Sequence, residues 1–253
     1  MKQDPSRQKD IFVGFLFLFF LFFFSSLLLL TFSISFYTVP KQAITLRSSL
    51  PVVIIDAGHG GEDGGAVGVN GAYEKDINLN VAKKLHSLLR AAGFQAVMTR
   101  TEDKLLYDRN AEYEGRKKAL DMQARLNMCR QYDHALFISI HQNAFVQKKY
   151  SGLQVYYSEN NPASQVLASI IQDLSSQSVC PGNDRKIKSA GSNIFLLKQL
   201  SLPSVLVECG FLSNQEECEK LTQDSYQTKL AMLLYSSVLE FFAKTDSFES
   251  GSS

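Results

Sequence analysis

The sequence predicts an α/β protein, a single domain with a central mixed, largely parallel sheet flanked by helices and preceded by one transmembrane helix. Three observations support this prediction. From residue 51 onward, short apolar runs alternate with amphipathic segments of helical spacing. The first apolar run ends in a glycine-rich polar stretch, as is typical where a buried strand leaves a sheet. Near the N-terminus, an uncharged apolar stretch is long enough to cross a membrane.

The N-terminal part of the chain has the most uneven composition. A polar segment, 1–10, is followed by residues 11–37, which carry no charge. About 20 apolar residues suffice to cross the hydrocarbon core, whereas the apolar core of a cleavable signal usually has about 7–15. We therefore expect a transmembrane signal anchor at 11–37, with 1–10 in the cytoplasm because Lys2, Arg7 and Lys9 precede the span. A long cleavable signal peptide is the alternative.

The rest of the chain divides into a linker, a domain and a tail. Residues 38–50 are mostly polar and contain Pro40, which suits a linker. A chain of 253 residues suits one domain with an appendage, so we expect a folded domain at 51–244 and a disordered polar tail at 245–253. The net charge is +1, with acidic and basic residues mixed along the chain. This distribution argues against a nucleic-acid-binding protein.

The strands of the domain are predicted from short apolar runs. Residues 51–56 (PVVIID) form a continuous run rich in β-branched side chains, which indicates a strand covered on both faces. Residues 135–141 (ALFISIH) and 204–208 (SVLVE) show the same character. Further strands are expected at 94–99, 153–157 and 193–197.

Helices are predicted between these strands. Residues 74–92 place Ile77, Val81 and Leu85 at helical spacing, and Gly93 supplies the C-terminal stop. Further helices are expected at 119–129, at 163–175, after a capping box formed by Ser213 and Glu216, and at 226–244.

The cysteines do not form a recognisable framework. Cys129, Cys180, Cys209 and Cys218 are even in number, yet their spacings match neither a disulfide-rich fold nor a CxxC pair. We expect mostly buried thiols.

Polar side chains follow the ends of several predicted strands. His59 comes after the first strand, His141 ends the run ALFISIH and Glu208 ends SVLVE, while Glu74 opens the first helix. In such sheets ligands gather outside the carboxyl ends of the strands, so these groups are expected to converge. Two histidines and one glutamate are a set of ligands that holds catalytic zinc with a fourth position open. The spare carboxylate, Glu208, is then the natural general base for amide hydrolysis.

Plainer interpretations remain for each part of this site. A single histidine or glutamate at a strand end is more often a structural or surface residue. Glycine-rich loops also bind phosphate, but Asp63 stands where a dinucleotide fingerprint needs its third glycine, and no GK[ST] follows. Cys209 adjoins Glu208 and would point to the opposite face of the strand, which argues against a cysteine nucleophile.

Three ordered motifs resemble a known family. DAGHGGEDGGAVG with Glu74 after it, SIHQNA around His141 and VECGFLSN around Glu208 are similar to the zinc-dependent N-acetylmuramoyl-L-alanine amidases of bacterial cell walls, the amidase-3 type. The resemblance runs from about Val52 to Phe242. It implies one zinc ion held by His59, Glu74 and His141, catalysis by Glu208, and peptidoglycan as the substrate, cut between N-acetylmuramic acid and L-alanine.

The resemblance also implies finer expectations. Arg100, Arg125 and Asn143 occupy places where the family has recurring polar residues, and are expected either to contact substrate or to form salt bridges within the fold. Only FVQKKYSG separates HQNA from the strand LQVYY, so no long helical plug is expected over the zinc. The sequence does not identify an activator protein.

The overall plan resembles the germination-specific amidases of endospore formers, which act in forming muramic-δ-lactam in the spore cortex. The expected location is then membrane-anchored, with the catalytic domain outside the cytoplasm and the forespore intermembrane space as a candidate compartment. A general vegetative cell-wall amidase, a zinc peptidase acting within the stem peptide and a non-catalytic peptidoglycan-binding scaffold are the alternatives.

Overall fold

The computed structural model describes Leu18, residues 20–25, residues 52–107 and residues 115–250, the last five by their backbone alone. In the N-terminal part, Leu18 and residues 20–25 are helical. No helix within the described residues is long and apolar enough to cross a membrane, which takes about 20 residues. This finding contradicts the predicted membrane-anchored location. The other residues of the predicted anchor at 11–37, and those of 1–10 and 38–50, lie outside the described part.

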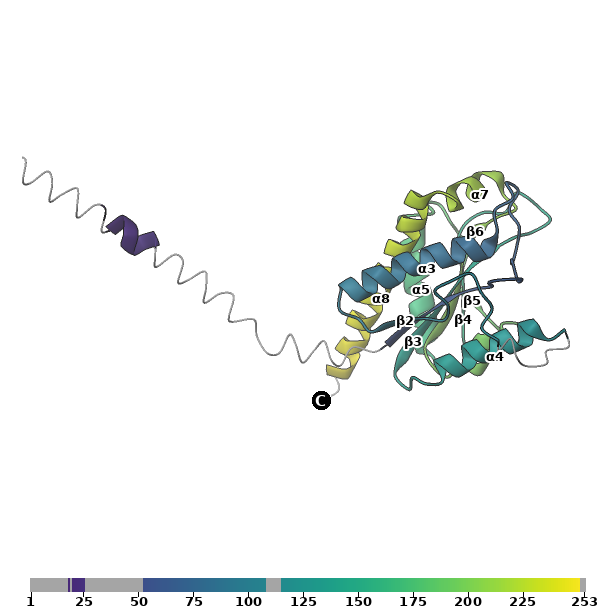
Figure 1. The fold of residues 1–253 in the computed structure, drawn as a ribbon, viewed down its shortest axis with the longest axis horizontal. Coiled ribbons are helices and arrows are strands. Elements are labelled where there is room, and N and C mark those ends of the chain that lie inside the picture. Colours follow the sequence, from purple (N-terminus) through teal and green to yellow (C-terminus); the bar gives the residue numbers. More distant parts are fainter. Residues whose placement is uncertain (1–17, 19, 26–51, 108–114, 251–253) are drawn as a thin grey trace, which may run out of the picture. The chain divides into compact units, whose positions relative to one another are not determined.

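The described residues contain one six-stranded mixed sheet, in the order β2-β1-β3-β6-β4-β5 (Figure 1). β1 pairs in parallel with β2 and β3, and β3 pairs in parallel with β6. β4 runs antiparallel to β6, and β5 is parallel to β4. The predicted α/β domain with a mixed, largely parallel sheet is confirmed. The strands are β1 Val52–Ala57, β2 Ala96–Met98, β3 Ala135–Asn143, β4 Gln154–Tyr157, β5 Lys188–Ser189 and β6 Ser204–Phe211.

Helices cover both faces of the sheet. α3, α5 and α8 pack on one face, whereas α4 and α6 pack on the other (Figure 1). Adjacent strand residues therefore face different layers: Ile55 belongs to the larger core and Ile54 to the smaller. The helices are α3 Glu74–Ala91, α4 Lys117–Cys129, α5 Ala163–Gln177, α6 Phe195–Gln199, α7 Gln215–Leu221 and α8 Asp224–Ser250.

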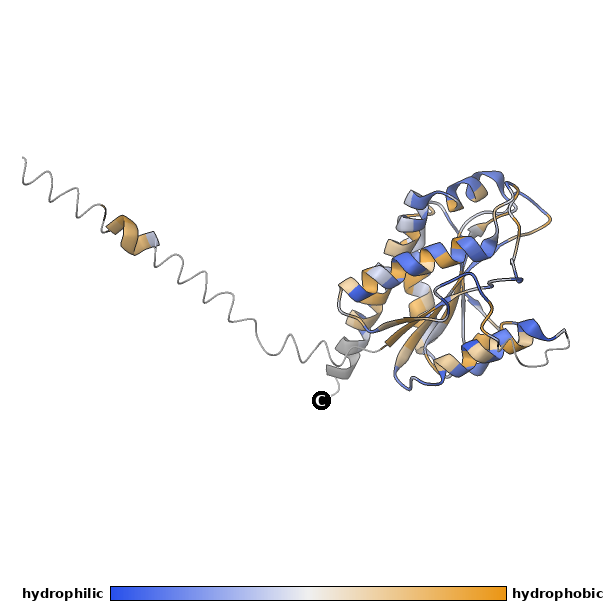
Figure 2. Ribbon diagram, viewed as in Figure 1, coloured by the Kyte–Doolittle hydropathy of each residue, from blue (hydrophilic) through white to orange (hydrophobic). Residues whose placement is uncertain are grey.

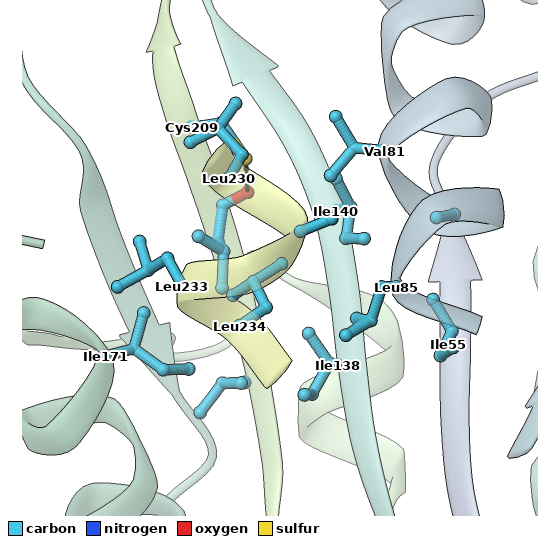
Figure 3. Packing of buried hydrophobic residues seen from close by; sticks show 14 of the residues in the cluster. Ile55, Val81, Leu85, Ile138, Ile140, Ile171, Cys209, Leu230, Leu233 and Leu234 are labelled. Atoms are coloured by element: carbon cyan, nitrogen blue, oxygen red, sulfur yellow. Dashed lines mark hydrogen bonds between the residues drawn. The ribbon is translucent and has the colours of Figure 1, made fainter. Parts of the chain in front are cut away.

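The two cores together explain why the strands are apolar on both faces. Ile138 and Ile140 of β3 pack between Leu85 of α3 and Leu234 of α8, and all four side chains are at most 1% exposed (Figure 3). Hydrophobic residues concentrate in the strands and on the inner faces of the helices (Figure 2). This packing makes the sheet a rigid support for the loops at its edges.

Two predicted elements differ from the structure. Residues 193–197, predicted as a strand, instead lead into the short helix α6, in which Leu196 and Leu197 are buried. A short apolar run does not distinguish a strand from a buried helical turn. The tail predicted at 245–253 is wrong for 245–250, where α8 continues: the Thr245 hydroxyl donates to the carbonyls of Phe241 and Phe242.

The predicted capping box is shifted by one residue. Asn214 is the N-cap of α7, and its side-chain oxygen accepts the N–H of Glu217 at 3.2 Å. The Ser213 hydroxyl accepts the N–H of Phe145 at 3.0 Å instead. Asparagine and serine are equally good N-caps, so the local pattern does not choose between them.

The cysteine prediction is confirmed. Cys129, Cys209 and Cys218 are buried free thiols, and Cys180 is a half-buried one.

Candidate metal centre and active site

His59 lies in the loop that follows β1 and has a left-handed backbone, with φ of 61°. Few residues other than glycine adopt this region, so the surrounding structure must hold it there. Gly58 is required for a different reason. A Cβ at this position would lie 2.2 Å from Nε2 of His141, so only glycine lets the loop approach that imidazole.

Glu74 is the first residue of α3, and its carboxylate joins both histidines. Oε1 lies 2.9 Å from Nδ1 of His141 and 3.2 Å from Nε2 of His59. The same carboxylate accepts the backbone N–H groups of Ala66 and Gln142 at 2.8 and 3.0 Å. Burial raises the pKa of Glu74, but the hydrogen bonds and charges of His141 and His59 outweigh it, holding the pKa well below its usual range.

The three predicted ligands therefore converge. One potential ligand atom from each of His59, Glu74 and His141 lies within 4.8 Å of the others. Two imidazoles and a carboxylate at this spacing fit a metal ion, and three protein ligands leave one position for water or substrate. The donor set itself thus agrees with the metal centre expected from the sequence.

Asp63 contacts the imidazole of His59 and holds its orientation, a role that was not predicted from the sequence. Its Oδ2 lies 2.9 Å from Nδ1 of His59, the ring nitrogen directed away from Glu74, and 3.4 Å from Nζ of Lys118. A carboxylate on the outer nitrogen of a ligand histidine fixes the tautomer and the ring orientation. The spacing of four residues between Asp63 and His59 was visible, but only the bent loop brings them together.

Glu208 is placed beside His141 by strand pairing. The two residues are Cα partners in the parallel ladder between β3 and β6, so their side chains share one face of the sheet. Oε2 of Glu208 is buried and has no hydrogen-bond partner among the described residues. Burial raises the pKa of Glu208 to about 7, and the charge of Glu74 adds to this, against the lowering effect of His141. A carboxyl poised near neutrality suits a general base.

Arg100 and Arg125 hold the backbone of the metal loop. Their side chains are buried, with residue exposures of 1% and 0%. Arg125 donates to the carbonyls of Ala57 and His59 at 2.8 and 2.7 Å, and Arg100 to those of Ala57 and Gly58 at 2.8 and 2.9 Å. Of the two roles expected from the sequence, the structure shows the one within the fold, because these guanidinium groups supply the donors that the bent loop needs.

Arg125 is itself held by two buried carboxylates. Its Nη1 lies 2.6 Å from Oδ1 of Asp56 and its Nε lies 2.8 Å from Oδ2 of Asp121. Asp56 also accepts hydrogen bonds from the hydroxyls of Thr99 and Ser139. Burial raises the pKa of Asp56, but Arg125 and these bonds outweigh it and lower the pKa to about 2. This ion-pair network lies directly beneath the metal loop.

A cleft of about 340 Å³ opens at the site. His59, His141 and Glu208 line one side, and Met122 of α4 and Phe195 near the start of α6 line another. Asn143, the third residue expected to contact substrate, borders a neighbouring pocket instead. Residues 144–153, which join β3 to β4, contain no helix.

The fold and the site together define a protein with a mixed α/β sheet whose edge carries a His-Glu-His group that could hold a metal ion. A family model for N-acetylmuramoyl-L-alanine amidase matches residues 53–240. The chain belongs to this family and is an amidase of peptidoglycan.

Relatives of known sequence agree. The germination-specific N-acetylmuramoyl-L-alanine amidase of Bacillus subtilis is 34% identical over 200 residues, covering 79% of this chain and 83% of that protein. The amidase LytC of the same organism is 32% identical over 75% of this chain and 35% of its own length.

Solved structures give the same result. The CwlD amidase of Clostridioides difficile, solved in complex with the GerS lipoprotein, has a TM-score of 0.72 and 37% identity, over 76% of this chain and 98% of that one. The catalytic domain of CwlV from Bacillus (Paenibacillus) polymyxa var. colistinus has a TM-score of 0.66 and 28% identity, over 77% and 99%.

Proposed function

We propose that the amidase depends on zinc, held by His59, Glu74 and His141, with Glu208 as the catalytic base. The convergence of the three ligand atoms within 4.8 Å carries this proposal. Two neutral imidazoles and one carboxylate are a common set for catalytic zinc. The contact between the Asp63 carboxylate and Nδ1 of His59 also supports the zinc site. Histidines that bind a metal through one ring nitrogen usually place a carboxylate or a carbonyl on the other.

The metal ion and the residues around it have separate roles in amide hydrolysis. When bound, zinc polarises the scissile carbonyl and makes water more acidic. Glu208 accepts a proton from the attacking water and passes it to the departing nitrogen of L-alanine. The products are then a lactyl carboxylate on N-acetylmuramic acid and a peptide with a free amino terminus. Met122 and Phe195 contribute apolar surface to the lining of the cleft at this site.

Digestion of purified peptidoglycan by the purified chain, with and without zinc, tests this proposal. The expected products, identified by mass spectrometry, are peptides with free L-alanine N-termini and glycan with intact muramic acid. Cuts within the peptide would support a zinc peptidase instead. No product despite bound zinc would indicate a scaffold or a missing activator.

We further propose that the enzyme acts in forming muramic-δ-lactam in the spore cortex. Its similarity to a germination-specific amidase over 83% of that protein supports this role, whereas LytC is matched over only 35% of its length. The experiment is to delete the gene in its own organism and analyse the cortex. Loss of muramic-δ-lactam is expected, and an unchanged cortex with an altered vegetative wall would favour the general amidase.

A further inference from the structure

A second pocket, of about 470 Å³, adjoins the catalytic residues. We call it the Arg185 pocket; its lining includes Asn143, Phe145, Tyr150, Gln154, Tyr156 and Arg185. Gln154 is the Cα partner of Glu208 across β4 and β6, so both side chains lie on the same face of the sheet. Tyr156 is near enough to Glu208 for that carboxylate to raise the pKa of its phenol, after burial, which is the larger cause. Two residues that line the pocket thus lie beside Glu208.

Arg185 is held in a fixed position within this pocket. Its Nε donates to the carbonyl of Ser151 at 2.7 Å. Its guanidinium carbon lies 4.7 Å from the centre of the buried Phe211 ring and 5.9 Å from that of Tyr150. Stacking on aromatic rings orients the planar guanidinium and lowers the entropy lost when a ligand binds.

The two Nη groups of Arg185 form no ion pair or hydrogen bond with a carboxylate among the described residues. Glu217 is an acidic residue near enough for the charge of Arg185 to lower its pKa, although burial, the larger cause, raises it. The Glu217 carboxylate instead accepts the backbone N–H groups of Gly152 and Phe211, at 2.8 Å each. Lys188 adds a second, exposed positive charge at the pocket. The pocket thus presents the Nη groups of Arg185 as hydrogen-bond donors, oriented by the rings of Phe211 and Tyr150.

We infer that the Arg185 pocket binds the peptide arm of the substrate through a carboxylate. A planar guanidinium with two free donors matches a carboxylate in a bidentate manner. The inference rests on the amide bond assigned above, which joins a peptide to an N-acetylated sugar. The peptide arm carries a carboxylate at its C-terminus, whereas in the substrate the lactyl carboxyl group of N-acetylmuramic acid is engaged in the amide bond that is cut. The glycan arm would then lie toward the cleft whose lining includes Met122 and Phe195.

Binding of a product peptide to the zinc-loaded full chain tests this inference. The probe is the tripeptide L-Ala-D-isoGln-L-Lys, as the free acid and as its C-terminal amide, measured by isothermal titration calorimetry. The free acid is expected to bind wild type at least about tenfold more tightly than the amide, as for charge-assisted hydrogen bonds. Arg185→Gln should abolish this difference, and Arg185→Lys should restore part of it.

Lys186→Gln is the matched control, because it removes the same charge from an exposed neighbour outside the pocket lining. It should retain the preference for the free acid. Equal binding of acid and amide by wild type, no binding of the acid, or an Arg185→Gln variant that behaves like Lys186→Gln would each overturn the inference. Digestion of peptidoglycan by the wild-type protein distinguishes a failure of this inference from a failure of the proposed amidase reaction. If free L-alanine N-termini appear although the calorimetry fails, only the inference about the Arg185 pocket is wrong.

Discussion

The guanidinium of Arg125 donates a hydrogen bond of 2.7 Å to the backbone carbonyl of His59, the residue whose φ of 61° turns its imidazole toward Glu74. A fully buried charged residue thereby holds the backbone of a proposed metal ligand. Because Arg125 is also bound to Asp56 and Asp121, the geometry of the site depends on a buried ion-pair network. The stability of variants at Arg125 and Asp56 should therefore depend on this network.

Replacing a ligand and replacing the base should have different effects. His141→Ala should lose the metal, because one of three donors is removed. Glu208→Gln should retain zinc while its turnover falls by about 10²–10⁴, the usual contribution of general acid–base catalysis. Metal content by mass spectrometry, together with the rate of release of L-alanine N-termini, measures both. Equal zinc loss in the two variants would contradict the assigned roles.

Asp63→Asn should weaken zinc binding by about 10–100-fold, the usual cost of losing the outer partner of a ligand histidine. Competition with a fluorescent chelator measures the affinity without reference to activity. Glu62→Gln is the matched control, since Glu62 is an exposed neighbour that pairs with Lys117 at the surface. Similar affinities for the two variants would show that Asp63 does not orient His59.

Arg125→Met should destabilise the fold by about 3–5 kcal/mol, because it leaves Asp56 and Asp121 buried without their cation. The free energy of unfolding in urea measures this. The exposed Arg130, at the end of the same helix, provides a control whose change to Met should cost less than about 0.5 kcal/mol. Comparable losses for both would mean that the buried network contributes little.

Stability should fall in acid through Asp56. Its pKa is about 2 in the folded protein, against an ordinary value of 3.8, so the unfolded chain binds its proton first as the pH falls. The stabilisation is therefore present above pH 4 and is lost between about pH 4 and pH 2, a change of about 2 kcal/mol. Urea unfolding of wild type and Asp56→Asn from pH 6 to pH 2 tests this. The free energy of unfolding of wild type should fall more steeply with decreasing pH than that of Asp56→Asn. Parallel curves for the two proteins would show that Asp56 does not cause the loss of stability in acid.

The centre of the site could be predicted from the sequence because each of its residues follows a recognisable element. His59, His141 and Glu208 stand at or just after the ends of apolar strand patterns, and parallel strands bring such ends to one edge. The two arginines could not be assigned in this way. Their polar side chains left both substrate contact and salt bridges within the fold open, and only the three-dimensional course of residues 57–59 shows that three consecutive carbonyls need their donors.

The missed elements have a common physical reason. β5 has only two residues, Lys188 and Ser189, and its pairing with β4 leaves no apolar pattern in the sequence. α6 is short, and its apolar residues bury against the sheet much as a strand would. Arg185 was also missed, because its stacking partner Phe211 is distant in sequence. Tertiary contacts determine all three.

The carboxylate of Glu74 links three separate parts of the chain. Its Oε1 lies within 3.2 Å of both imidazoles, and its two oxygens accept the backbone N–H groups of Ala66, in the loop after β1, and of Gln142, in β3. A substitution of Glu74 should therefore weaken metal binding and also release the loop from the sheet, so that a loss of metal and a loss of local order arise together.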